Sequence, residues 1–166
     1  MPLRQIILAS PETLSDMLLA AEDRYQDAEE LLAQQRYDGC VYLLGFSAEM
    51  LLKYVCMRLR GLTPADPVKP ALSALKHWMK HSSPTVSWID YHDLPFFVRS
   101  IEALRLNIGR PLALGLQREL SARMIAGVYE EWIVDMRYRR SGISDLRAWQ
   151  LLENAWWIKS NWIQLL

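Results

Sequence analysis

The pattern of hydrophobic and polar positions is dominated by one long apolar stretch that runs from Tyr37 to Arg60. A helix on the surface of a protein keeps a polar stripe, so a stretch this apolar predicts a helix buried on most of its circumference. Its length would suit a membrane span, but each charge at the centre of a bilayer costs roughly 2.5 to 3.5 kcal/mol. Because charges lie at its middle, we predict the central helix of a soluble bundle and no membrane association. The polar residues between Cys40 and Leu59 are Ser47, Glu49, Lys53 and Arg58.

The rest of the chain also carries apolar residues at every third or fourth position, which predicts further helices. The first is expected to begin at Ser10-Pro11-Glu12, where a capping hydroxyl, a proline and an acid follow one another. We expect a break at Asp38-Gly39, so that this helix and the central one form an antiparallel hairpin. No strand-like alternation of residues occurs in the sequence. Later helices are expected within 71–80, 91–108, 117–135 and 144–166.

The expected C-terminal helix carries two apolar stripes. One stripe can pack on the core of a monomer, but a second one with exposed tryptophans would form a larger apolar patch than soluble monomers usually tolerate. We therefore predict a homodimer formed through this helix; in the alternative, the helix lies in the middle of the bundle and both stripes are core. The first stripe consists of Leu146, Trp149, Trp156 and Ile163, with Leu152 and Lys159 close to it, and the second of Leu151, Ala155, Ile158, Trp162 and Leu165.

Length and composition suit one globular domain. For the 166 residues we predict a single all-α domain over 1–166, an antiparallel bundle of about five to six helices. The net charge of zero excludes a strongly basic nucleic-acid binder. Residues 1–36 carry seven acids and three bases, whereas residues 53–81 carry six bases and one acid. This asymmetry indicates either solvated faces that balance each other or a modest anion-attracting rim.

The two cysteines, Cys40 and Cys56, are predicted to be buried and unpaired. They lie sixteen positions apart on one expected helix, which is about 24 Å at 1.5 Å per residue and too far for a disulfide. The apolar part of the N-terminus is too short for a secretory signal. We therefore expect a reduced, cytoplasmic location.

The three histidines decide most hypotheses of enzymatic function. His77 and His81 are four residues apart, a spacing that metal sites use, but no nearby side chain completes a set of ligands. We therefore expect no metal and no cofactor. His92 is the histidine candidate for catalysis. The sequence has neither a glycine-rich phosphate loop nor a serine nucleophile elbow.

The densest positive cluster is the segment Arg137-Tyr138-Arg139-Arg140, which is expected to form a turn between two helices. Its guanidinium groups could contact phosphate through paired hydrogen bonds, and Tyr138 adds a face for stacking. These four residues are candidates for binding RNA or another ligand, and Arg137 is a candidate for catalysis. In the alternative, an arginine of this segment pairs with Glu49.

Glu49 and Lys53 are expected to form a structural pair, because they lie four residues apart with the acid first. A buried charge without a partner costs several kcal/mol. We therefore predict that Glu49 accepts a hydrogen bond from Arg137, Tyr138 or Lys53.

Several motifs support a family resemblance. Tyr37 enters the central helix and is followed by the pairs Ala48-Glu49 and Leu52-Lys53. The sequence YHDL at 91–94 opens a later helix, and MRYRRS at 136–141 leads into the tryptophan-rich last helix. With these motifs the chain resembles the HEPN domain superfamily over roughly residues 20–60 and 130–160.

The resemblance implies an all-helical bundle, usually a homodimer, that is often paired with a minimal nucleotidyltransferase as toxin and antitoxin. Many HEPN members are metal-independent endoribonucleases that use an Arg-x(4–6)-His motif. In this sequence no arginine stands five to seven positions before His77, His81 or His92. Lys76 has that spacing from His81, but a lysine cannot make the planar two-pronged phosphate contact of an arginine.

Two functional hypotheses follow. The favoured one is a dimeric HEPN-like interaction module, associated with nucleic acid or nucleotides and lacking the ribonuclease motif, in a bacterial toxin–antitoxin or defence system. The alternative is an active, metal-independent endoribonuclease toxin with a non-standard site, in which Arg137, Arg139 or Arg140 acts together with His92.

Overall fold

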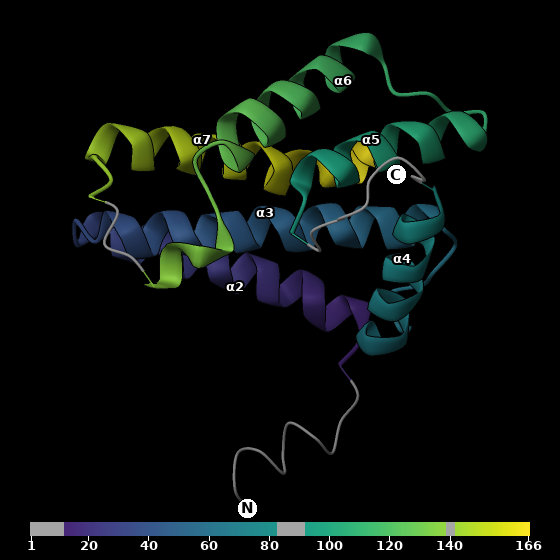
Figure 1. Ribbon diagram of the computed structural model, residues 1–166, viewed down its shortest axis with the longest axis horizontal. Coiled ribbons are helices and arrows are strands. Elements are labelled where there is room, and N and C mark those ends of the chain that lie inside the picture. The colour runs from purple at the N-terminus through teal and green to yellow at the C-terminus, as the bar shows by residue number, and fades with distance from the viewer. Residues whose placement is uncertain (1–11, 83–91, 139–141) are drawn as a thin grey trace, which may run out of the picture.

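The computed structural model describes residues 12–82, 92–138 and 142–166, and these form a helical bundle (Figure 1). No strand occurs in the described residues, where the one β-type contact is an isolated bridge between Thr13 and Pro67. The predicted all-α fold class is confirmed. The α-helices are α2 (Leu14–Ala33), α3 (Tyr37–Leu59), α4 (Val68–Ser82), α5 (Leu94–Asn107), α6 (Leu114–Ser121) and α7 (Asp145–Asn161), accompanied by the π-helix η1 (Ala122–Tyr129) and the 3₁₀-helices η2 (Val134–Tyr138) and η3 (Trp162–Leu165).

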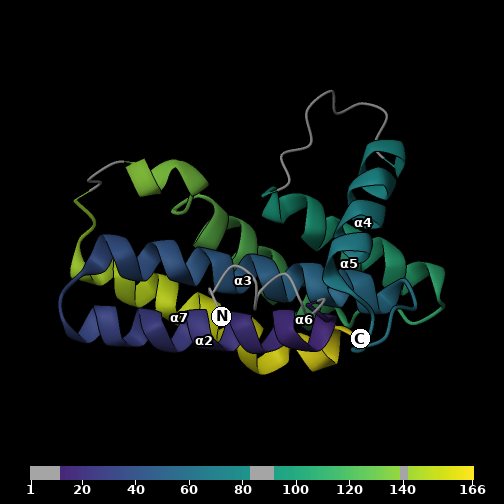
Figure 2. The same cartoon turned by 90° about the horizontal axis from the view of Figure 1, so that it is seen from below.

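α2 and α3 form the predicted antiparallel hairpin (Figures 1 and 2), but its ends differ from the expectation. The helix cap is Thr13, whose hydroxyl accepts a hydrogen bond from the backbone N–H of Asp16 at 3.2 Å. The Asp16 carboxylate accepts one from the Thr13 N–H at 2.8 Å, which completes a capping box. Ser10 and Pro11 lie outside the described residues.

The connection between the two helices was also predicted at the wrong place. The chain turns at residues 34–36, where Gln35 has a φ of 59°, and Asp38-Gly39 lies inside α3. Asp38 is favourable in the first turn of a helix because the helix dipole attracts a negative charge there. An Asp-Gly pair is therefore no break in this position.

α3 lies between α2 and α7 in Figure 1 and forms the core of the bundle. Among the described residues it is the one helix whose length and composition would allow a membrane crossing, but 78% of its most apolar 18 residues are buried inside the bundle. Its cysteines, Cys40 and Cys56, are buried free thiols, as predicted. The burial is that of the core helix of a water-soluble bundle.

A close contact between α3 and Trp132 determines how the later part of the chain packs. Trp132 is 1% exposed, and its Nε1 donates a hydrogen bond to the backbone oxygen of Tyr42 at 3.1 Å. A Cβ atom on Gly45 would lie 2.1 Å from Cγ of Trp132, so the indole can lie against α3 only because this residue is glycine. Trp132 therefore belongs to the core, whereas the next residue, Ile133, is 53% exposed.

Two further helices differ from the prediction. α4 covers the fifteen residues Val68–Ser82 and so extends beyond the expected range 71–80 at both ends. The single helix expected over 117–135 is instead divided into α6, η1 and η2. A Cβ on Gly127 in η1 would lie 2.3 Å from Nδ2 of Asn154, so the missing side chain lets α7 approach closely here. The division follows from these contacts with α7 and α3, which a helical period in the sequence does not reveal.

Candidate functional site: a buried charge pair and a histidine

Three polar side chains meet at the middle of α3. Glu49 and Lys53 lie one turn apart on α3 and are each 4% exposed. Nζ of Lys53 donates a hydrogen bond to Oε1 of Glu49, and Nδ1 of His92 lies 2.7 Å from Oε2 of the same carboxylate. The site is thus a carboxylate that holds a lysine on one oxygen and a histidine on the other.

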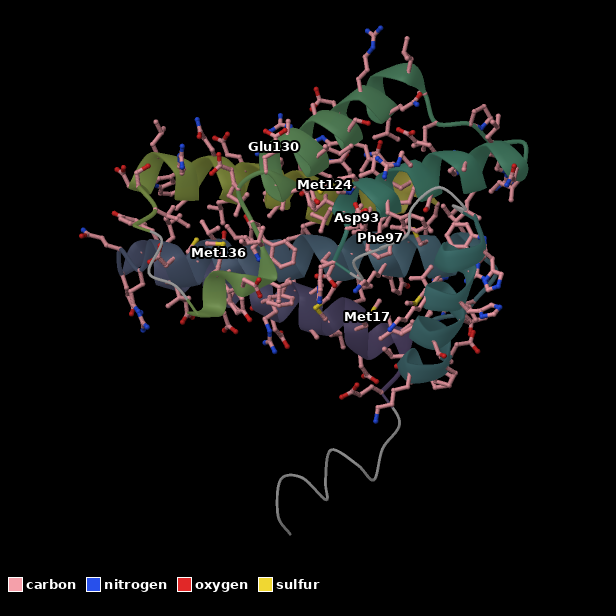
Figure 3. All side chains as sticks on the ribbon, in the orientation of Figure 1. Met17, Asp93, Phe97, Met124, Glu130 and Met136 are labelled. Carbon is pink, nitrogen blue, oxygen red and sulfur yellow. The ribbon has the colours of Figure 1, made fainter. Side chains whose placement is uncertain are left out.

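His92 is positioned by the start of α5. The following residue, Asp93, caps this helix by accepting a hydrogen bond from the backbone N–H of Phe96 at 2.9 Å. Figure 3 shows Asp93 and Phe97 at this end of α5, over α3. The ring of Phe97 also lies 5.4 Å from Nζ of Lys53, so the same helix turn covers the buried ammonium group.

Aromatic rings hold the imidazole of His92 in one orientation. The rings of Phe46 and Trp132 meet it edge to face, each with a centroid distance of 6.3 Å. The side chain remains 33% exposed, unlike its carboxylate partner. When Nδ1 carries the proton and donates it to Glu49, Nε2 is the acceptor nitrogen of the ring. An oriented, partly exposed imidazole of this kind can act in general acid–base chemistry.

A pocket of about 430 Å³ between α2, α3 and α4 opens onto the charge pair. Its walls include the apolar side chains of Met17 and Leu72, whereas Glu12 and Asp16 add carboxylates. Hydrogen bonds from Thr13 hold the pKa of Asp16 below its usual value, so this carboxylate is charged at neutral pH. The pocket therefore suits a neutral or cationic group better than a phosphate.

The other predicted site residues are placed only in part. The backbone of Arg137 and Tyr138 ends η2, so these two residues belong to a 3₁₀-helix and not to the expected turn. Their side chains lie outside the described part of the structure, as do Arg139 and Arg140 entirely. A hydrogen bond from Arg137 or Tyr138 to Glu49 therefore stays a prediction, whereas the predicted bond from Lys53 to Glu49 is present.

The contact between His92 and Glu49 was missed by the sequence reasoning. The two residues are 43 positions apart, and one sequence contains no signal for a contact at that separation. The capping residue Asp93 and the helix that follows were recognisable, and they fix where His92 stands. His77 and His81 do lie together, with ring centroids 4.1 Å apart. The described residues contain no group of three or more His, Cys, Asp or Glu side chains that could hold a metal ion.

α7 and the 3₁₀-helix η3, which follows it directly, present one apolar stripe to the core and the other to solvent. The inner stripe is buried at Leu151, Ala155, Ile158 and Leu165. Leu152, which was placed near the outer stripe, is only 8% exposed, and Lys159 pairs with Glu22 at 2.9 Å. The alternative in which both stripes are core is therefore wrong for a single chain. The outer stripe, called the α7 seam below, consists of Leu146 (64% exposed), Trp149 (54%), Trp156 (55%) and Ile163 (65%).

No family model, no curated protein and no solved structure matches this chain. The likeness to HEPN domains therefore stays a prediction that rests on the sequence motifs. The features of the structure that bear on function are the α7 seam and the cluster of Glu49, Lys53 and His92.

Proposed function

We propose that the protein is a HEPN-like module that works as a homodimer and associates with RNA in a bacterial toxin–antitoxin or defence system. We further propose a cytoplasmic location and a nucleotidyltransferase-type antitoxin as partner, as the family resemblance implies. The observation that carries the dimer is the α7 seam, four large apolar side chains that are each more than half exposed. Apolar patches of this kind on soluble proteins mark interaction surfaces.

The spacing of the α7 seam favours a second copy of the chain as its partner. Glu153 and Ser160 lie between its members and are exposed as well. With these two residues included, the seam positions are alternately three and four residues apart, which is the spacing of a heptad repeat. Helices with such a seam pair with each other through it. A two-fold dimer brings the same patch of each copy together, which covers all four apolar side chains without requiring a different protein.

The dimer is tested by co-expressing tagged and untagged copies of the chain. The untagged copy should be retained with the tagged one, and Trp156→Glu in both copies should abolish this retention. Leu106→Glu is the matched control, because Leu106 is 66% exposed on α5, outside the α7 seam. Retention of the Trp156→Glu pair at the level of the Leu106→Glu pair would show that the seam is not the interface.

A second candidate function, metal-independent RNA cleavage, is favoured by the bond between His92 and Glu49. In such a reaction a base takes the proton of the ribose 2′-hydroxyl, the oxygen attacks phosphorus, and an acid returns a proton to the departing 5′-oxygen. A carboxylate-held imidazole can perform the first step. Lys53 is buried and bound to Glu49, so the cation for the developing phosphate charge has to come from elsewhere. We propose the segment Arg137-Tyr138-Arg139-Arg140 for that role.

Cleavage is tested by incubating RNA with wild-type protein and with His92→Ala, Arg137→Ala and Arg118→Ala. If the site cleaves RNA, His92→Ala and Arg137→Ala lose at least about 100-fold in rate, the typical contribution of an acid–base group. Arg118→Ala, which removes an exposed arginine on α6 outside the proposed site, should behave as wild type. Absence of cleavage by wild-type protein in the presence of chelator leaves the non-catalytic, RNA-associated module as the function.

A further inference from the structure

A second pocket, separate from the charge pair, lies where the end of α3 meets α4. It has a volume of about 800 Å³ and is lined by Arg60, Ser73, His77, Trp78 and His81 among others. In Figure 1 this is the side of the molecule where α4 crosses the end of the bundle. The described lining contains cationic, titratable and aromatic groups and no carboxylate. It is therefore the reverse of the acid-lined pocket at Glu49.

Arg60 is the fixed cation of this pocket. It caps α3, and its guanidinium carbon lies 5.1 Å from the centroid of the Trp78 ring. Stacking on an indole orients a planar guanidinium and leaves its edge for hydrogen bonds. Its Nη1 atom is buried and has no hydrogen-bond partner in the part of the chain that the structure describes. A buried donor without an acceptor is costly, so an oxygen-rich ligand at this place would be stabilising.

His77 and His81 line the pocket one turn apart on α4. Their rings are tilted by 34° at a centroid distance of 4.1 Å, and both side chains are exposed. Nδ1 of His81 lies 2.8 Å from the backbone oxygen of His77. Since a carbonyl can only accept, Nδ1 carries a proton there. That bond leaves Nε2 as the nitrogen of His81 that can meet a ligand. Among the described residues no third His, Cys, Asp or Glu side chain joins the pair to complete a metal site.

The surroundings of the pocket also carry positive charge. Between Tyr54 and Trp78 the chain has four basic residues and one acid, Asp66. The carboxylate of Asp66 accepts hydrogen bonds from the backbone N–H and the hydroxyl of Thr63, so it is already bonded within its own loop. A local excess of cations beside an unsatisfied arginine attracts phosphate groups in particular, because a phosphate accepts the two parallel bonds of a guanidinium.

We propose that this pocket binds the phosphate group of a nucleotide or of an RNA strand, with Arg60 as the main contact, His77 as a further donor and His81 as a donor in its protonated form. The pocket shares no residue with the cluster at His92 or with the α7 seam. Phosphate binding here is consequently separate from dimerisation and from cleavage, and its failure would leave both untouched.

The test is calorimetric titration of the full chain with three probes: inorganic phosphate, adenosine monophosphate and a short single-stranded RNA, at one fixed salt concentration. Binding of the mononucleotide identifies a nucleotide site, and binding of the RNA alone identifies a strand. In either case Arg60→Ala should weaken binding by about tenfold or more, as expected for hydrogen bonds to a charged group. Arg118→Ala is the matched control, because it removes an exposed arginine of α6.

A second variant keeps the test valid if Arg60→Ala fails to fold. Ser73→Glu places a carboxylate on the exposed wall of the pocket and should repel the phosphate, whereas Ala126→Glu, at an exposed position of η1, should not. The proposal is wrong if wild-type protein binds none of the three probes or if Ser73→Glu binds as tightly as Ala126→Glu. It is also wrong if zinc binds and phosphate does not, since the histidines would then form a metal site.

Discussion

α3 and α7 depart from the usual distribution of side chains in opposite directions. α3 buries an ion pair, Glu49 and Lys53, inside the core, whereas α7 exposes two tryptophans, Trp149 and Trp156, to solvent. Both arrangements are unfavourable unless another group compensates. For α3 the compensation lies within the chain, because each charge is bonded to the other and Glu49 also to His92. For α7 the described residues leave Trp149 and Trp156 more than half exposed.

The difference separates two kinds of functional information. A buried polar cluster that is satisfied within one chain reports on chemistry or on the specificity of the fold. An apolar surface that one chain leaves uncovered reports on an interaction with another molecule. We therefore assign the chemical part of the proposed function to α3 and the assembly to α7. The predictions below test this assignment, from the largest expected effect to the smallest.

Removing the buried acid should have the largest effect on stability. Glu49→Ala leaves the ammonium group of Lys53 buried without its partner, and we expect the free energy of unfolding to fall by about 3 to 5 kcal/mol in urea denaturation. Glu119→Ala is the matched control. Glu119 pairs with Arg123 at the same four-residue spacing but is exposed, so its loss should cost less than about 1 kcal/mol. Equal stability of the two variants would mean that solvent reaches Glu49.

Replacing the whole ion pair should recover much of that loss. The double variant Glu49→Leu with Lys53→Met removes both charges and fills the space with apolar atoms, and such replacements are often neutral or stabilising. We expect it to be more stable than Glu49→Ala by at least about 2 kcal/mol. If the double variant is as unstable as Glu49→Ala, the hydrogen bond to His92 and not the ion pair dominates the energetics of the cluster.

The exposed tryptophans should contribute little to the stability of a single chain. Trp149→Ser should change the free energy of unfolding by less than about 0.5 kcal/mol when measured in a Trp156→Glu background that prevents assembly. Leu152→Ala, three positions further along the same helix, removes a core side chain and should cost about 2 to 5 kcal/mol. A large loss for Trp149→Ser would place this side chain in the core and remove it from the α7 seam.

The thiols of the two cysteines of α3 should be unreactive towards alkylating reagents in the native protein. Burial raises the pKa of Cys40 to about 11 and raises the pKa of Cys56 above its ordinary value. Both are therefore protonated at pH 8, and the thiolate that reacts with alkylating reagents is scarce. In mass spectrometry we expect no labelling of the native protein at pH 8 and labelling of both after denaturation. Labelling of Cys56 in the native protein would show that the core of α3 opens.

How far the sequence predicts this molecule depends on the separation of the residues in contact. α3 was predicted from Tyr37 to Arg60 and runs from Tyr37 to Leu59. The prediction succeeds because an apolar run of that length is compatible with few structures other than a buried helix. The pair of Glu49 and Lys53 follows from their spacing on one helix. The bond between His92 and Glu49 does not, since it depends on how α5 docks on α3.

The errors have local physical causes. Asp38-Gly39 has the composition of a turn, but the helix dipole favours the acid, and the chain turns at Gln35 instead. The helix expected over 117–135 is divided because Trp132 packs on Gly45 and Asn154 packs on Gly127, contacts that no periodicity contains. The exposure of the α7 seam was one of two outcomes that the sequence allowed, since a helix at the edge of a bundle buries only one of two apolar stripes and a central helix buries both.

The mass of the wild-type particle tests the central claim. According to this claim, the buried charges of α3 are compensated within one chain, whereas the exposed apolar side chains of the α7 seam are covered by a second copy. Light scattering of purified protein at micromolar concentration should give twice the 19.3 kDa mass of the chain, and Trp156→Glu should give a folded particle of 19.3 kDa. A wild-type particle of 19.3 kDa at that concentration would contradict the dimer and leave the exposed tryptophans without a partner of the same chain.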